Sequence, residues 1–120
     1  MSSGHTITIT PSEGHVEVTL DGEVLASSDN ALRLDETGLP ARYYLPKSDV
    51  RMDLLEATTF HTTCPFKGEA SYWSVTVGET RHDGIVWGYE TPIEAAKDIA
   101  GFVSFYPDRT QIAVDGAPAS

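Results

Sequence analysis

The 120-residue chain contains a single cysteine, Cys64. One cysteine cannot form an intrachain disulfide, and with four histidines it does not supply the paired ligands typical of a structural zinc site. The simplest compartment for such a chain is a reducing cytoplasm. We therefore expect a cytoplasmic protein without bound zinc and without a cofactor.

Basic residues are also scarce, with 8 Lys and Arg against 18 Asp and Glu and a net charge of −10. Binding to nucleic acid or to an anionic membrane surface requires a basic face. Neither partner is therefore expected. The negative charge favours solubility, and we expect a monomer or a weak homo-oligomer.

Long apolar runs and known catalytic motifs are missing as well. No run approaches the ~20 residues of a membrane span, and residues 1–10 lack the basic and apolar segments of a signal peptide. The chain has no glycine-rich phosphate loop, no His-Glu-x-x-His and no Gly-x-Ser-x-Gly. The function must therefore be inferred from the fold and from candidate pocket residues.

Short stretches of alternating polar and apolar residues dominate the chain, which is typical of β-strands. Residues 71–77 form the clearest of them, and Asp21-Gly22 between two apolar runs predicts a tight hairpin. One helix is predicted at about 92–100, because Thr91 and Glu94 can form a capping box around Pro92.

The order of these elements indicates the fold class. Eight or nine short strands follow one another without intervening helices, which excludes parallel βαβ units. The sequence therefore predicts a mainly β domain, either an antiparallel barrel or a pair of packed sheets, with one short helix. A chain of this length buries enough surface for one domain.

Amphipathic rings and cations are concentrated in the middle of the chain, where both tryptophans and four of the five tyrosines lie. Rings with polar tips beside cations suit a pocket for a small ligand, although a small β-domain can use the same rings as ordinary core. The set comprises Arg42, Tyr43, Tyr44, Cys64, Lys67, Tyr72, Trp73, Trp87 and Tyr89.

Cys64 and Glu36 each allow two interpretations. A thiol near Lys67 can be a nucleophile, with His61 as its base only if the chain bends between them, but a lone cysteine is more often a buried structural residue. Glu36 precedes Arg42 and could pair with it at the mouth of a pocket, or it could be a solvated loop carboxylate.

Several segments resemble a known bacterial family. Residues 34–40, 42–46, 49–52 and 63–68, followed by Tyr72-Trp73, are similar to the family called domain of unknown function 427. In the second half, Trp87-Gly88-Tyr89, Pro92 and residues 99–101 and 105–106 extend the resemblance. It covers about residues 14–116, which leaves an N-terminal segment with an opening strand (1–13) and a frayed tail (117–120).

The resemblance implies a β-tent-like fold, in which two antiparallel sheets meet at an angle around a cleft. Many proteins with this fold hold zinc through two cysteine pairs, which this chain lacks. The resemblance implies no particular activity, because the family is defined as a domain of unknown function. Its recurring residues match Glu36, Arg42, Tyr43, Cys64, Lys67, Gly68, Trp73 and Tyr89.

The leading hypothesis is a module that binds an unidentified small molecule in an aromatic cleft, with Trp73, Tyr89 and Lys67 facing one cavity. An enzyme that uses Cys64 as nucleophile or redox group, and a domain that binds a peptide or protein, are the alternatives. The candidate ligand-binding residues are Glu36, Arg42, Tyr43, Cys64, Lys67, Trp73, Trp87 and Tyr89.

Overall fold

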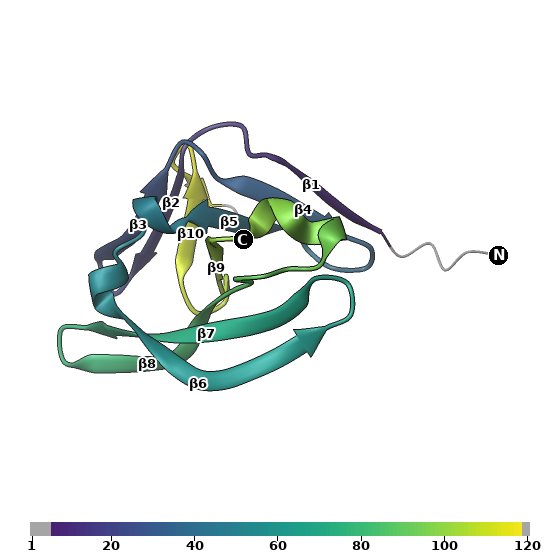
Figure 1. Cartoon of the computed structure of the whole chain (residues 1–120). Helices are drawn as coiled ribbons and strands as arrows, with labels where there is room; N and C mark the ends of the chain where they lie inside the picture. Colours follow the sequence, from purple (N-terminus) through teal and green to yellow (C-terminus); the bar gives the residue numbers. More distant parts are fainter. Residues whose placement is uncertain (1–5, 119–120) are drawn as a thin grey trace.

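The computed structural model describes residues 6–118, which form two antiparallel sheets (Figure 1). The predicted mainly antiparallel β class is confirmed, with eleven strands in the described part instead of the expected eight or nine. The strands are β1 (Ile7–Pro11), β2 (Val16–Leu20), β3 (Glu23–Ser28), β4 (Leu32–Glu36), β5 (Arg42–Pro46), β6 (Leu55–Cys64), β7 (Gly68–Val77), β8 (Thr80–Gly88), β9 (Phe102–Phe105), β10 (Gln111–Val114) and β11 (Ala117–Pro118).

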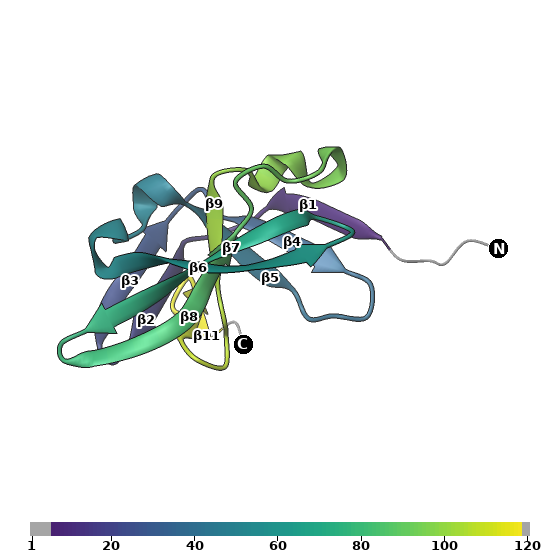
Figure 2. The same ribbon diagram turned by 60° about the horizontal axis from the view of Figure 1, so that its bottom comes forward.

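The larger sheet has seven strands in the order β1-β4-β5-β9-β8-β7-β6. It curves, so that β6, β7 and β8 lie below β1, β4 and β5 in Figure 1, and it does not close into a barrel. Figure 2 shows β6, β7 and β8 as long neighbouring strands that β9 connects to the rest. The curvature gives this sheet an inner face.

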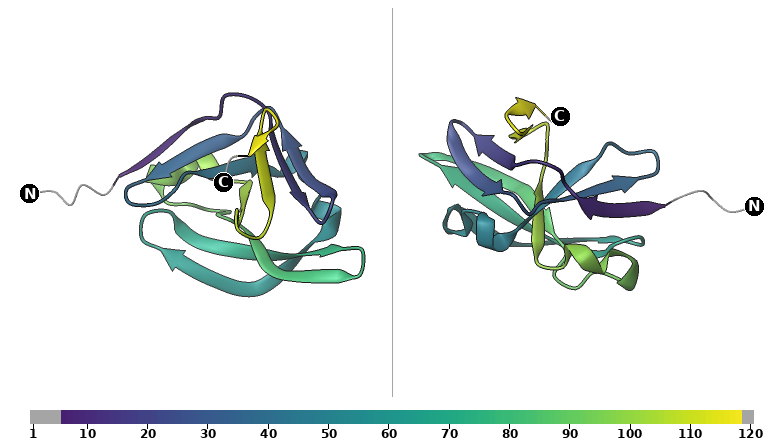
Figure 3. Two further views of the ribbon diagram at one scale, coloured as in Figure 1. Left: turned by 180° about the vertical axis from the view of Figure 1, so that it is seen from behind. Right: turned by 90° about the horizontal axis from the view of Figure 1, so that it is seen from above.

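The smaller sheet has the order β11-β10-β2-β3 and packs beside the larger one (Figure 3). Its β2–β3 hairpin confirms the Asp21-Gly22 prediction, because both turn residues have positive φ, 51° and 82°. The expected opening strand is present as β1, and residues 1–5 of the N-terminal segment lie outside the described residues. Of the tail, Ala117 and Pro118 pair with β10, while residues 119–120 lie outside the described part.

The expected helix at about 92–100 is not an α-helix. The segment forms the 3-10 helix η3 (Glu94–Ile99), which is kinked at Ala96. Its N-cap is Ile93, with no side-chain hydrogen bond, so the prediction of a capping box at Thr91 is wrong. The backbone N–H of Ile93 donates instead to the carbonyl of Lys67 at 2.9 Å. This tertiary hydrogen bond anchors the segment to the β6–β7 turn and replaces local capping.

Two further 3-10 turns, η1 (Lys47–Asp49) and η2 (Met52–Leu54), connect β5 to β6. Neither of these two turns contains a buried residue, and the core is built mainly from sheet residues. No helix within residues 6–118 is long and apolar enough to cross a membrane.

Two groups of buried side chains occupy the two faces of the larger sheet. The inter-sheet core fills the space between the sheets and includes Val18, Leu25, Leu45, Trp73, Val75, Val86, Val103, Phe105 and Ile112. The inner core lies on the other face and consists of Leu34, Tyr44, Ala70, Trp87, Tyr89, Ala96 and Ile99, the last two from η3. Neighbouring residues such as Tyr44 and Leu45 belong to different cores because side chains alternate along a strand.

Candidate functional site

A buried ion pair connects two distant parts of the larger sheet. Glu36 ends β4, Lys67 lies in the turn between β6 and β7, and Nζ of Lys67 is 2.8 Å from Oε1 of Glu36. The side chain of Glu36 is only 7% exposed, and that of Lys67 is 11% exposed. Strands β4 and β7 are not neighbours in the sheet, so the pair bridges the curve at its inner face. Glu36 thus pairs with Lys67, where the sequence had suggested Arg42.

The rings of the inner core are oriented by a buried hydrogen bond. The indole N–H of Trp87 donates to the hydroxyl of Tyr44 at 3.2 Å, and the two rings meet edge to face with centroids 6.3 Å apart. The ring of Tyr106 lies against that of Trp87, with the ring centroids 4.5 Å apart and the planes inclined by 43°. Burial raises the pKa of Tyr44 and of Tyr89, so both phenols stay protonated at neutral pH.

Tyr44→Phe is expected to lower the free energy of unfolding by about 1–3 kcal/mol, because the buried indole N–H of Trp87 loses its acceptor. The substitution also reduces the dependence of the free energy of unfolding on pH. The ordinary tyrosine pKa is 10.0, and a pKa raised in the folded state makes stability decrease as pH rises above that value. Urea unfolding of both proteins across this range measures the two effects.

Tyr89→Phe is the matched control for this variant. Tyr89 is also buried, but no side-chain hydrogen bond is found for its hydroxyl within residues 6–118. We expect a smaller loss of stability at neutral pH than for Tyr44→Phe. Equal losses in both variants would show that the Tyr44–Trp87 hydrogen bond has no special weight.

Cys64 lies at the margin of the inner core and is half-buried. His61 and Cys64 belong to a continuous ladder in which His61 pairs with Ser71 and Cys64 with Gly68. Without a bend, residues three apart on a strand project from opposite faces. Nδ1 of His61 lies 3.4 Å from the hydroxyl of Ser71. The bend that a His61–Cys64 pair needs is absent.

Trp73 and Tyr89 do not belong to the same core. Trp73 belongs to the inter-sheet core, whereas Tyr89 belongs to the inner core. The ammonium of Lys47 lies 4.9 Å from the Trp73 ring centroid, a cation–π distance, and also pairs with Glu90. The structure therefore divides the candidate residues between the two faces.

A cavity of about 410 Å³ opens where β5 and β9 of the larger sheet approach β10 of the smaller one. We call it the inter-sheet cavity. Its wall is mostly apolar. The lining residues are Pro40, Ala41, Arg42, Tyr43, Phe105, Pro107, Asp108 and Ile112.

Arg42 differs from most of the cations. Six of the eight have a carboxylate partner: Arg33, Lys47, Arg51, Lys67, Arg81 and Lys97. Within residues 6–118, Arg42 and Arg109 have no such ion pair. Arg109 is exposed, but Arg42 is half-buried in the wall of the inter-sheet cavity. The cavity thus presents a guanidinium that forms no ion pair within residues 6–118, although the wall also contains the carboxylate of Asp108.

The eight candidate residues occupy three places. Arg42 and Tyr43 line the inter-sheet cavity, and Trp73 lies beneath Lys47. Glu36, Cys64, Lys67, Trp87 and Tyr89 surround the inner face. Phe105 and Ile112 were not among the candidates, because alternation in the C-terminal strands indicates only core positions. Pro107 and Asp108 lie in the loop between these strands, and no sequence motif singles them out.

No group of three or more His, Cys, Asp or Glu within the described residues could hold a metal ion. A model of the family described as Domain of unknown function (DUF427) matches residues 8–116, nearly the whole chain. This match confirms the resemblance recognised from the sequence motifs. Among curated proteins, none matches the chain.

Proposed function

We propose that this chain, which belongs to the DUF427 family of domains of unknown function, binds a small organic anion in the inter-sheet cavity. The observation that carries this proposal is the position of Arg42. In a protein with a net charge of −10, a half-buried arginine without a carboxylate partner is available to an anionic ligand group. Its planar guanidinium can donate two parallel hydrogen bonds to a carboxylate or phosphate.

The rest of the wall supports an apolar ligand body. Tyr43 and Phe105 contribute rings, and Ile112 contributes an aliphatic surface from the other sheet. A volume of about 410 Å³ lies within the usual range of small-molecule sites. Asp108 adds an acceptor, so a ligand that also carries an N–H or O–H donor suits the cavity best.

Arg42→Gln is expected to weaken the binding of 4-aminobenzoate, which combines a carboxylate, a ring and an amino group, by about tenfold or more. Glutamine keeps a polar side chain but removes the charge and the fork of donors. Titration of the 15N-labelled protein, followed by backbone amide shifts, measures both affinity and location. Benzoate and phenyl phosphate in parallel titrations test the contributions of the amino group and of the anion.

Arg109→Gln is the matched control, because Arg109 also lacks an ion pair within the described part of the chain but is exposed and outside the cavity wall. It should leave the affinity unchanged. The proposal is wrong if none of the three probes shifts amides around the cavity. Equal weakening in both arginine variants would also contradict it, because that result indicates nonspecific attraction by charge.

A further inference from the structure

We propose that the chain has a second binding site, for a neutral sugar ring, in a groove over β6, β7 and β8. The groove has a volume of about 690 Å³ and shares no lining residue with the inter-sheet cavity. Pyranose rings combine apolar C–H faces with a rim of hydroxyl groups. A complementary site needs an aromatic surface, neutral hydroxyls and polar groups that can both donate and accept hydrogen bonds.

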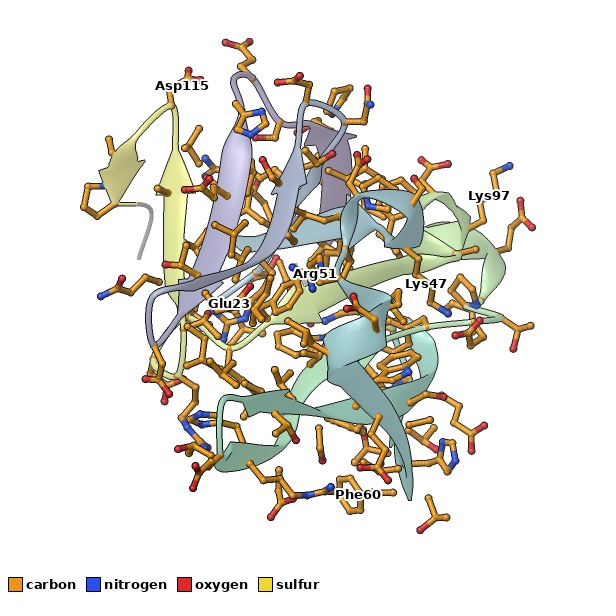
Figure 4. All side chains as sticks on the ribbon, turned by 90° about the vertical axis from the view of Figure 1, so that its left-hand side faces the viewer. Glu23, Lys47, Arg51, Phe60, Lys97 and Asp115 are labelled. Carbon is orange, nitrogen blue, oxygen red and sulfur yellow. The ribbon has the colours of Figure 1, made fainter. Side chains whose placement is uncertain are left out.

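The aromatic surface is supplied by Phe60 and Tyr72. Phe60 projects from β6 with 60% of its surface exposed, an unusual position for a phenylalanine. Its ring centroid lies 5.0 Å from that of Tyr72, with the planes inclined by 54°. In Figure 4, Phe60 lies at the lower edge of the molecule, away from Glu23 and Arg51. A ligand whose C–H face covers these rings removes their apolar surface from water.

The hydroxyls of the groove retain capacity for a ligand. Tyr72 and Thr62 share one hydrogen bond of 2.8 Å between their oxygens, and each hydroxyl oxygen has two lone pairs for accepting further hydrogen bonds. The hydroxyl of Ser74 accepts a hydrogen bond from the backbone N–H of Gly84 at 3.0 Å, and can still donate its own proton. These groups are uncharged and do not favour an ion.

The charged residues of the groove neutralise one another. Arg81 donates to Asp83 at 2.7 Å and to Glu56 at 2.6 Å. An arginine held by two carboxylates has little attraction left for an anion, unlike Arg42. The Arg81–Asp83 pair instead offers adjacent N–H donors and carboxylate acceptors, which match neighbouring hydroxyls on a sugar ring.

The test is titration of the 15N-labelled protein with the methyl glycosides of glucose, galactose, mannose and N-acetylglucosamine. At least one glycoside is expected to bind with a dissociation constant of about 1–10 mM and to shift amides of β6, β7 and β8. Phe60→Ala should weaken that binding by about tenfold or more. Asp83→Asn should also weaken it, because the amide is a poorer acceptor than the carboxylate.

Phe66→Ala is the matched control, since Phe66 is also an exposed phenylalanine but does not line the groove. It should leave glycoside binding unchanged, and circular dichroism checks that each variant is folded. Failure of all four glycosides to shift these amides overturns the proposal. So does equal binding by Phe60→Ala, or a response confined to the inter-sheet cavity. Cellotetraose is titrated in parallel with methyl glucoside. Equal affinities for the two ligands agree with a site for a single sugar ring, whereas a much higher affinity for cellotetraose contradicts it.

Discussion

Lys67→Met is expected to lower the free energy of unfolding by about 3–5 kcal/mol, because it leaves the buried carboxylate of Glu36 without its cation. Methionine keeps the length and apolar stem of the side chain, so the loss reports the charge more than the packing. The same pair links the β6–β7 turn to β4 across the inner face. Its loss therefore weakens a long-range connection that no neighbouring strand replaces. Urea unfolding measures the effect.

Two further variants separate the charge from the site. The double variant Glu36→Leu, Lys67→Met is expected to recover most of the lost stability, since two apolar side chains leave no unpaired buried charge. Lys97→Met breaks an exposed pair with Glu94 and should cost no more than about 1 kcal/mol. If Lys67→Met is no more destabilising than Lys97→Met, the buried pair does not have the structural role assigned to it.

Gly88→Ala is expected to lower the free energy of unfolding by about 3 kcal/mol, because an added methyl group has no room. The Cβ would lie 2.6 Å from the backbone carbonyl oxygen of Phe102 and 3.1 Å from Cγ1 of Val103. Both residues belong to β9, which pairs with β8 at this point. The backbone of one strand must move to remove the clash, and that movement displaces Trp87 beside it.

Gly78→Ala is the control for this substitution. Gly78 has φ of +60°, and no atom lies within 4 Å of the Cβ position. Alanine there meets only the cost of a left-handed backbone, about 1–2 kcal/mol. In thermal unfolding, Gly88→Ala should thus have a lower melting temperature than Gly78→Ala. The opposite order would mean that the space between β8 and β9 adapts without cost.

The sequence alone predicted the features that depend on neighbours in the chain. The Asp21-Gly22 turn forms as expected, because a tight hairpin turn needs positive φ at both central residues and the Asp-Gly dipeptide adopts it readily. The segment 71–77 is part of β7, since its alternation matches a sheet with buried side chains on one or both faces. The motifs around Glu36 and Cys64 likewise identified the family.

The helix shows where local patterns fail. Thr91, Pro92 and Glu94 satisfy the rules for an α-helix start, yet the segment forms a kinked 3-10 helix. Its first backbone donor is taken by the carbonyl of Lys67, which lies far away in sequence. A short helix gains little from its own hydrogen bonds, so a tertiary contact can determine its geometry.

The grouping of the aromatic residues was decided only by the tertiary structure. Sequence proximity placed Trp73 and Tyr89 in one candidate cleft, but in the structure Trp73 belongs to the inter-sheet core and Tyr89 to the inner core. Likewise, the curvature of that sheet pairs Glu36 with Lys67 and leaves Arg42 to the inter-sheet cavity. Residue types and turns are local properties and can be read along the chain. Which side chains meet depends on how seven strands curve and pack, because those contacts join residues that no local pattern relates.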